Sequence, residues 1–517
     1  MYRPTFDITH TLKESQGGHL DNIQTTLGQR ALQKGLTQWS TSKKTLERRA
    51  NNILLLRKFL AENPEQDTYL QEVFENLQSV SEIFEPSESV WKDKTSEQIF
   101  FETGGLGGFL NHIPGIVAIM VFMKVWLAPA LAIATPFIMF VLPYFMLQFM
   151  YNVNISWSKY QSMALDMFIG ERSFNLHSLG KILYFVVSLS QTIIQPFLTS
   201  IAVRKLDVLV QYRGEQLNFC YSAADQIFAI FREAGMDSIP HIPKDNESEQ
   251  SSKSKYVLFA RDKDERWSTL YLGQLLGDAE VLYCLARDTR FTKTVWLPEG
   301  DETVLEINTF HDISIKSDPK TSSIKFTTHS SHSLLTGPNR GGKSSNLRGI
   351  LQNVLWAQTY GLAPCHSYKG KLFSWIVSSL RVEDRPGASS LFEREIEIAT
   401  DILRRNQTGL VLIDEIFHST NPPDGEKSAR IFLEQLWSRT NIVSCVSTHV
   451  YSIVEDASDK IQRICCFAKE NEDKTISYGY TLQKGICKVS SVDDVLREKG
   501  LVRESVQESV KESVRLG

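Results

Sequence analysis

A glycine-rich stretch has the residue types and spacing of a phosphate-binding loop. It reads LLTGPNRGGKSSNLRGI over residues 334–350 and fits the pattern G-x-x-x-x-G-K-[ST] at each fixed position. In such a loop backbone N–H groups converge on phosphate oxygens, the lysine offsets phosphate charge and the serine hydroxyl reaches Mg²⁺. An isolated match could be a simple glycine-rich turn, but a second ATPase element follows. We therefore predict a site for ATP and Mg²⁺ built from Gly337, Pro338, Asn339, Arg340, Gly341, Gly342, Lys343, Ser344 and Ser345.

The second element is an apolar strand that ends in two carboxylates. Residues 410–414 read LVLID, and Asp414 is followed directly by Glu415. In P-loop enzymes the first carboxylate lies beside the Mg²⁺, and the second can orient or deprotonate the attacking water. The alternative, an acidic turn after a strand, is disfavoured by the phosphate loop upstream. We predict Ser344 and Asp414 as metal ligands and Glu415 as a catalytic residue.

Two further groups complete the candidate site. Asp424 follows a proline-rich turn, STNPPDG, and we assign it to the turn of the second motif. The apolar strand 442–446 leads through Ser447 and Thr448 to His449. A lone histidine is more often structural, but strand ends face the site in doubly wound sheets. His449 is therefore a second catalytic candidate that could sense the γ-phosphate.

Composition sets the broad limits. With 517 residues the chain can hold two to four domains, and its net charge of −4 gives no global signature of nucleic-acid binding. Any DNA binding would have to come from a local patch or from an assembly. The seven cysteines show no C-x-x-C spacing, which indicates neither a zinc site nor a disulfide framework. We expect reduced thiols, and hence an ATPase domain in a reducing compartment.

Two apolar runs predict a membrane-associated insert over residues 113–204. Lys124 is the only charge in 116–150, and this run exceeds the roughly 20 apolar residues that one spanning helix needs. Prolines recur in it every seven residues, which membrane helices tolerate better than soluble ones. The run could form one tilted span or a tight hairpin; a buried core helix is the alternative. The second run, 182–203, is uncharged but contains several polar residues and could be a span or a buried helix.

Helical spacing of apolar residues before and after the insert predicts one soluble bundle. Two helices are expected over residues 21–60, with a break near 39–42. If both flanks belong to one bundle, the chain must cross the bilayer an even number of times. We therefore expect a multi-pass membrane protein that contacts lipid, in an orientation and a membrane that the flanking charges do not define.

The motifs TGPNRGGKSS, DEIFHSTNPPDG and STHV together resemble the ATPase of the MutS family of DNA mismatch-repair proteins. That family's phosphate loop carries an Asn after Gly-Pro, as Asn339 does here, and its second motif is an extended DEI element ending in Asp-Gly. The chain supplies the second motif with Asp414, Glu415, Ile416, Thr420, Asp424 and Gly425. The resemblance implies an α/β P-loop NTPase domain of the ABC type at the C-terminal end. A helical lever domain, here with transmembrane helices, would precede it.

Residues 389–395, SSLFERE, are similar to the family's Ser-Thr-Phe signature helix. In that family the serine contacts the nucleotide bound by the partner subunit. The resemblance therefore implies a contact in trans for Ser390 and a homodimer through the ATPase domain. The chain departs from the family at Leu391, where Thr is usual, and where the glycines of the second motif are replaced by Phe417, His418 and Ser419. These departures bear on the turnover rate more than on nucleotide binding.

The resemblance extends outward and suggests a domain plan. Residues 25–36 and 273–290 are similar to lever segments, and 480–501 to a helical dimerisation element. The predicted parts are a first lever segment (1–112), the insert with transmembrane helices 116–150 and 182–203, a second lever segment (205–300) with a mobile loop (241–255), the ATPase domain (301–479), the dimerisation element (480–501) and a polar tail (502–517).

Three functions are consistent with these features. The first hypothesis is a membrane-anchored MutS-like ATPase that couples ATP binding at composite dimer sites to lever movement. The alternative is a DNA mismatch-repair or recombination factor. The family resemblance supports this alternative; the balanced charge, the apolar insert and the expected lack of a mismatch-reading domain before residue 20 weigh against it. A structural membrane protein with a vestigial site is disfavoured by the intact Lys343, Asp414 and Glu415.

Overall fold

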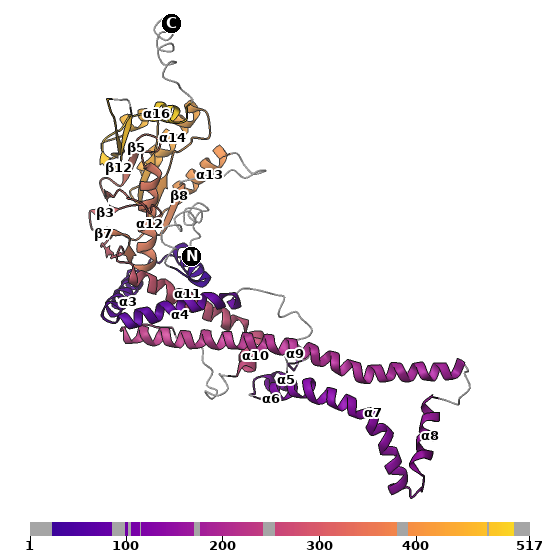
Figure 1. Ribbon diagram of the computed structural model, residues 1–517. Helices are drawn as coiled ribbons and strands as arrows, with labels where there is room; N and C mark the ends of the chain where they lie inside the picture. The colour runs from indigo at the N-terminus through magenta and orange to yellow at the C-terminus, as the bar shows by residue number, and fades with distance from the viewer. Residues whose placement is uncertain are drawn as a thin grey trace. The chain divides into compact units, whose positions relative to one another are not determined.

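The computed structural model describes residues 23–84, 99–101, 105–113, 115–169, 176–240, 254–379, 391–472 and 475–500. The chain divides into two compact units (Figure 1). The first unit comprises residues 1–78, 228–239 and 276–517. The second comprises residues 79–227 and 240–275. The predicted catalytic and nucleotide-binding residues all belong to the first unit, and the apolar runs belong to the second.

A six-stranded sheet forms the centre of the first unit, with the strand order β12-β11-β5-β10-β9-β8. Its bounds are His332–Thr336 for β5, Trp375–Ser379 for β8, Gly409–Ile413 for β9, Ile442–Ser447 for β10, Gln462–Glu470 for β11 and Ile476–Lys484 for β12. All neighbours pair in parallel except β11 and β12. Every residue of β5, β9 and β10 is buried, as expected for parallel strands covered on both faces.

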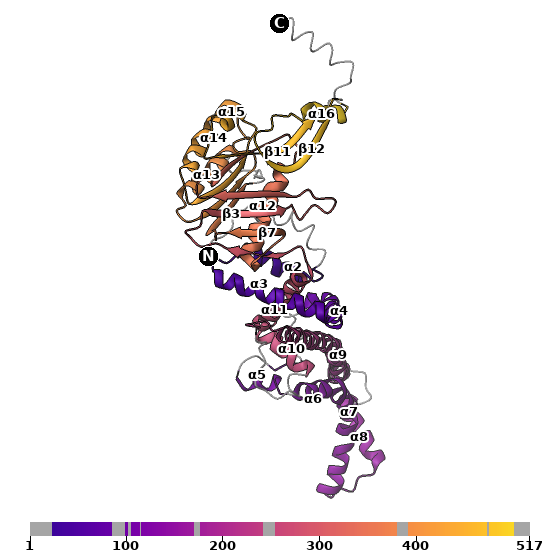
Figure 2. The same ribbon diagram turned by 90° about the vertical axis from the view of Figure 1, so that its left-hand side faces the viewer.

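Helices cover the sheet on both faces. Helices α13 (Leu391–Arg404), α14 (Pro422–Trp437) and α15 (Tyr451–Asp456) share one apolar core with the strands and lie along one side of the sheet (Figure 2). Helix α12 (Lys343–Tyr360) contacts β9 of this sheet and β3 of a second sheet. The predicted α/β architecture is therefore present around the phosphate loop.

The second sheet has four strands in the order β2-β7-β3-β4. Its strands are β2 (Val295–Trp296), β3 (Thr303–Phe310), β4 (Ser322–Thr327) and β7 (Cys365–Gly370), while β1 (Thr292–Lys293) pairs with β6 (Leu362–Ala363). Gly349 of α12 lies so close to Phe310 of β3 that a side chain there would crowd the ring. The segment 480–501 was predicted to be helical, but it is so only in α16 (Val492–Glu498), because residues 480–484 complete β12.

The N-terminal helices of the first unit are α2 (Thr26–Thr37), α3 (Lys43–Glu62) and α4 (Pro64–Val80). Thr25 and Ser42 cap the first two, because each side-chain oxygen accepts a hydrogen bond from a backbone N–H in the first turn. The break expected near 39–42 is thus confirmed. The C-terminal end of α12 contacts α3 and the residues before it. Ser40 N donates to Gln358 O at 2.7 Å, and Arg49 Nη1 donates to Thr359 O at 2.6 Å.

The second unit is helical in its described part. After η2 (Ser81–Phe84) come α5 (Gly105–Asn111), α6 (Ile116–Phe122), η4 (Met123–Leu127), α7 (Ala128–Phe145), η5 (Met146–Met150), α8 (Trp157–Ile169), α9 (Leu176–Glu233), α10 (Lys255–Asp264) and α11 (Arg266–Arg287). Helices α9 and α11 continue into the first unit. The predicted mobile loop 241–255 lies outside the described residues up to 253, and Lys255 already begins α10.

Residues 116–150 form one continuous helical run rather than a hairpin. Pro136 and Pro143 lie inside α7, and the run contains two π-helical turns, η4 and η5. Such widened turns are a common way for a helix to adjust its hydrogen bonding. The helix α9 likewise continues past Arg204, where the sequence changes from apolar to mixed, because nothing there interrupts its backbone hydrogen bonds.

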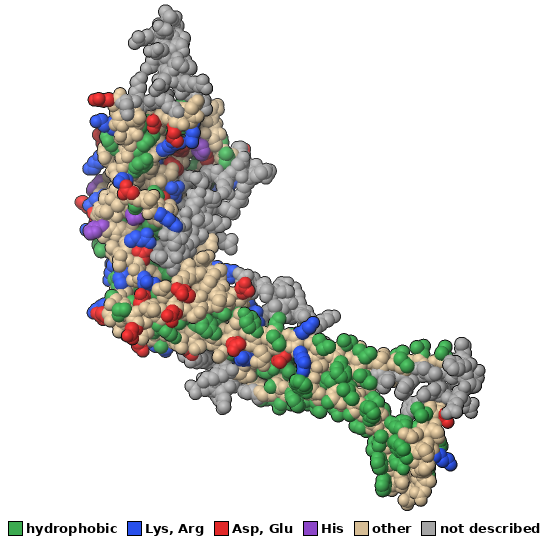
Figure 3. Space-filling model, in the orientation of Figure 1, with side chains coloured by type: hydrophobic (Ala, Val, Ile, Leu, Met, Phe, Trp, Pro, Cys, Tyr) green, Lys and Arg blue, Asp and Glu red, His purple; other side chains and the backbone are tan. Residues whose placement is uncertain are grey.

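Large apolar side chains cover the outside of α7 and of the first part of α9 (Figure 3). By length and hydropathy, the described segments Ile116–Met150 and Val186–Glu233 could each cross a membrane. In their most apolar windows only 28% and 12% of the residues are buried, which is unlike the core helix of a soluble protein.

Candidate nucleotide site

The phosphate loop follows directly from the buried strand β5. Gly337 and Gly342 have φ angles of +142° and +93°, which favour glycine. A side chain at Gly337 would also meet the carbonyl oxygen of Cys466 on β11. Helix α12 begins at Lys343, so the loop closes over the helix N-terminus, where free N–H groups and the helix dipole favour an anion.

Lys343 lies at the centre of the predicted site. Its Nζ donates to Gly337 O at 3.1 Å and to Pro338 O at 3.3 Å, and it lies 3.1 Å from His449 Nε2. Only 5% of Lys343 is exposed, and this burial lowers the pKa of its ammonium. The lysine is thus held against the loop by carbonyl oxygens of Gly337 and Pro338.

The predicted metal ligands contact each other, with Ser344 in the first turn of α12 and Asp414 directly after β9. Ser344 Oγ donates to Asp414 Oδ2, and Ser447 Oγ donates to Asp414 Oδ1. Ser447 Oγ also accepts a 3.0 Å hydrogen bond from Glu415 N. A hydroxyl and a carboxylate are hard oxygen ligands that suit Mg²⁺, which binds to few protein groups and to substrate phosphates. These residues therefore fit the ion that a P-loop implies.

Glu415 and His449 form the second half of the site. Glu415 Oε1 lies 2.9 Å from His449 Nε2. This hydrogen bond is the main cause that lowers the pKa of the Glu415 carboxyl, and Lys343 and His418 contribute through their charge. One ring nitrogen cannot donate to Glu415 and accept from Lys343 at once, so the pairing with Glu415 requires a proton on Nε2.

The remaining predicted residues take other positions. Asn339 and Arg340 are exposed at the loop tip, where Arg340 donates to Glu498 of α16, and Ser345 Oγ accepts from Arg348 at 3.3 Å. Asp424 lies in the first turn of α14 and accepts from Asn421 Nδ2 at 2.8 Å, a position that favours an acidic side chain. The predicted trans contact, Ser390, lies outside the described residues.

Two residues at the site, Ser447 and Glu395, were not assigned a role from the sequence. Ser447 joins Asp414 and Glu415 by hydrogen bonds, and its position at the end of β10 could have suggested it. Glu395 of α13 is buried and accepts from Ser419 Oγ, while its Oε1 lies 3.2 Å from His418 Nδ1. No sequence spacing indicated this second contact, because α13 and the turn after β9 are joined only by tertiary packing.

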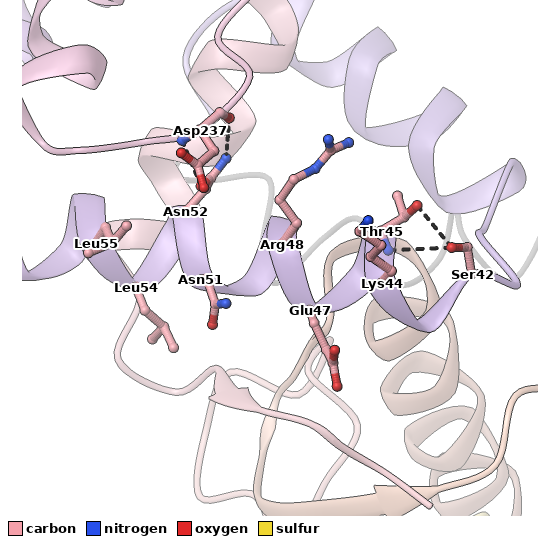
Figure 4. Close-up of a pocket in the computed structure, with 10 residues that line it drawn as sticks. All are labelled: Ser42, Lys44, Thr45, Glu47, Arg48, Asn51, Asn52, Leu54, Leu55 and Asp237. Atoms are coloured by element: carbon pink, nitrogen blue, oxygen red, sulfur yellow. Dashed lines mark hydrogen bonds between the residues drawn. The ribbon is translucent and has the colours of Figure 1, made fainter. Parts of the chain in front are cut away.

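A separate groove of about 790 Å³ runs along α3 (Figure 4). Asn52 joins its wall to the turn after α9, since Asn52 Nδ2 donates to Asp237 O at 2.8 Å. None of the predicted site residues lines this groove, which is formed by Ser42, Lys44, Thr45, Glu47, Arg48, Asn51, Asn52, Leu54, Leu55 and Asp237.

Comparison with known proteins finds relatives of the region around the site. Residues 333–516 match the family model of MutS domain V. The DNA mismatch repair protein Msh6 of Homo sapiens is 29% identical over 184 residues, which cover 34% of this chain and 14% of Msh6. The DNA mismatch repair protein MutS of Thermus thermophilus is 30% identical over 176 residues, covering 34% of this chain and 22% of that protein. The chain thus matches less than a quarter of the length of either relative.

Proposed function

We propose that this chain binds and hydrolyses ATP with Mg²⁺. The premise is its membership of the MutS family, which the match of residues 333–516 to MutS domain V indicates. The observation that carries the proposal is the contact between residues of the α12 N-terminus and residues after β9 and β10. Lys343 lies beside His449, Ser344 donates to Asp414, and His449 pairs with Glu415. An ammonium, two oxygen ligands and a paired carboxylate are the groups that phosphoryl transfer requires.

Each residue has a distinct part in the proposed reaction. The N-terminus of α12 and Lys343 bind the β- and γ-phosphates. Ser344 and Asp414 would hold a Mg²⁺ ion, which would offset phosphate charge. Glu415 orients the attacking water and accepts its proton. The contact of Glu415 Oε1 with His449 Nε2 holds the carboxylate in place, and it also lowers the pKa of the Glu415 carboxyl.

The test of this proposal compares two variants. Lys343→Ala should weaken ATP binding by about a hundredfold, because it removes a buried cation from the phosphate site. Glu415→Gln should keep ATP affinity within about twofold and slow hydrolysis by about a hundredfold. Lys427→Ala, an exposed lysine of α14, is the matched control and should change neither quantity. Equal ATP affinity in wild type and Lys343→Ala would refute the site.

Both relatives are DNA mismatch repair proteins, which supports a function in mismatch repair over that of an ATPase that does not bind DNA. We therefore propose DNA as the second ligand of this chain. Homodimerisation through the ATPase domain, with Ser390 reaching the partner's ATP, remains part of this proposal. The test is a salt titration with a short duplex and the same duplex carrying one mismatched pair. Tighter binding of the mismatched duplex supports repair, and equal, salt-dependent binding supports general DNA contact. Failure to bind either duplex contradicts both.

We further propose that α7 and the first part of α9 lie in a membrane. Between Trp126 and Tyr144 the exposed side chains of α7 are apolar, among them Leu131, Phe137 and Ile138. Eighteen residues of helix at about 1.5 Å per residue extend about 27 Å, close to the roughly 30 Å of a bilayer's hydrocarbon core.

Aromatic side chains lie near both ends of α7. At one end Arg204 lies 4.5 Å from the ring centroid of Trp126, and at the other the rings of Tyr144 and Trp157 are 4.8 Å apart. Tyrosine and tryptophan with nearby cations are typical of membrane interfaces. The full chain should therefore stay with the bilayer fraction after alkaline carbonate washing, and deletion of residues 116–203 should release it. Recovery of the full chain in the soluble fraction would exclude spanning helices.

A further inference from the structure

The turn that carries the catalytic carboxylate, residues 415–419, has an unusual backbone. Glu415 and Phe417 have φ angles of +56° and +53°. Residues with a side chain rarely adopt this left-handed region, and they keep it only where their surroundings hold them. We call residues 415–419 the catalytic turn. The surroundings of the catalytic turn must therefore hold its backbone in this conformation.

Helix α13 supplies a contact of this kind through a single buried carboxylate. Glu395 accepts from Ser419 Oγ with one oxygen, and its other oxygen lies 3.2 Å from His418 Nδ1. The same Nδ1 lies 2.8 Å from the carbonyl oxygen of Glu415. Because a carbonyl oxygen only accepts, Nδ1 must carry the proton. Glu395 is thus connected to the backbone of Glu415 through one imidazole.

Aromatic packing holds the middle of the same turn. Phe417 is buried, and its ring lies 6.0 Å from that of Phe392 on α13 and 6.3 Å from that of Phe432 on α14, with edge-on geometry in both pairs. Helix α14 also approaches the turn closely, since a side chain at Gly425 would meet the carbonyl oxygen of Phe417. The catalytic turn is therefore packed between α13 and α14, and Glu395 of α13 contacts its last two side chains, His418 and Ser419.

We propose that Glu395 is a positioning residue for ATP hydrolysis, which holds the catalytic turn so that the Glu415 carboxylate stays paired with His449. It acts through His418 and Ser419, two positions at which this chain departs from its family. The inference rests on the proposed ATPase function and adds a residue that regulates its rate.

A purely structural role for Glu395 makes a different prediction. A buried carboxylate that only stabilises the fold would, when removed, reduce ATP binding and turnover together. A positioning role affects the orientation of Glu415 and leaves the phosphate loop intact, because Glu395 contacts Ser419 and His418 of the catalytic turn. The ratio of turnover to affinity therefore distinguishes the two roles.

The experiment uses the full chain in detergent, with binding of a fluorescent ATP analogue and single-turnover hydrolysis as readouts. Glu395→Ala should lower the hydrolysis rate about tenfold, which corresponds to about 1.4 kcal/mol, and keep nucleotide affinity within about twofold. Glu395→Gln keeps an acceptor for Ser419 and should recover part of the rate. Glu397→Ala removes an exposed carboxylate from the same helix and should match wild type.

A double variant separates action through Glu415 from any other effect. In a Glu415→Gln background, the further change Glu395→Ala should reduce the remaining rate by less than twofold, since the group to be positioned is already lost. A full tenfold further loss would overturn the proposal, as would Glu395→Ala behaving like Glu397→Ala. A parallel loss of affinity in both Glu395 variants would assign Glu395 to the fold alone. A wild-type chain that does not hydrolyse ATP would instead refute the proposed function itself.

Discussion

The sheet around the nucleotide site and the helix α7 use apolar side chains in opposite ways. In β5, β9 and β10 every residue is buried, and this includes polar residues such as His332 and Ser444. In α7 the buried residues are few, while Phe137 and Met139 are each 69% exposed. The first region buries polar groups in pairs inside an apolar core, and the second presents a nearly pure apolar surface.

The difference shows that hydropathy and burial carry separate information. The strand LVLI at 410–413 and the run in α7 are both apolar in the sequence, but β8 and β10 flank the strand and every residue of it is buried, while few residues of α7 are buried. An exposed apolar surface of this extent marks an interaction site, such as a membrane. A charge introduced into either region therefore tests what surrounds it.

The largest effect is expected from a charge in the sheet. Leu410→Lys places an ammonium at a position with 0% exposure between β8 and β10. An unpaired buried charge is among the few changes that cost more than about 4 kcal/mol, so we expect loss of the folded first unit. Limited proteolysis of the ATPase region measures this loss. A protease-resistant variant with normal ATP binding would mean that this strand is not in the core.

A smaller and conditional effect is expected from the same kind of change in α7. Ile138 is 50% exposed, so Ile138→Lys should alter stability by less than about 0.5 kcal/mol if water surrounds the helix. In the middle of a bilayer the same lysine should cost about 2.5–3.5 kcal/mol of insertion. The fraction of protein that remains in carbonate-washed membranes is the measurement. Unchanged retention would weaken the membrane proposal, and ATP binding should stay normal in either case.

The smallest effect concerns a buried polar group of the sheet. Burial lowers the pKa of His332 to about 4, below the roughly 6.5 of an unfolded chain. Between about pH 4 and pH 6.5 the unfolded state binds more protons at His332 than the folded state does. The contribution of His332 to the free energy of unfolding is therefore complete above about pH 6.5 and is lost as the pH falls toward 4. The free energy of unfolding changes through this one group by at most about 1.4 kcal/mol per pH unit.

Thermal unfolding of the full chain at pH 7 and pH 5 measures this effect. The wild type should lose more stability at pH 5 than His332→Gln does, because glutamine does not titrate. Comparing the two proteins removes the contribution of other titrating groups. An identical pH dependence in wild type and variant would show that His332 is not buried as a neutral group.

The parts of the site that are local in the sequence could be predicted from it. The spacing of glycines and Lys343 defines the loop before any fold is known, and Asp414 and Glu415 follow a recognisable buried strand. The contact of His449 with Glu415 also agrees with its expected position after a strand. These features depend on neighbours a few residues away, which is the range over which sequence patterns are informative.

Features that depend on packing between distant segments could not be predicted. Glu395 looks like any helical carboxylate in the sequence, and its burial depends on where α13 lies against the turn after β9. The extent of α9 was also not apparent, because a change from apolar to polar residues at Arg204 does not end a helix whose backbone hydrogen bonds continue.

Both ends of helix α12 are fixed by their surroundings, and this restricts changes in the length of the helix. Lys343 opens the helix at the phosphate site, and Gly361 closes it with a φ of +71° where any side chain would strike the carbonyl oxygen of Leu46 on α3. One inserted or deleted codon between these residues would turn one end relative to the other by about 100° and shift it by about 1.5 Å. Substitutions along α12 are therefore far more acceptable than any change in its length, and natural variants should keep the number of residues from Lys343 to Gly361 constant.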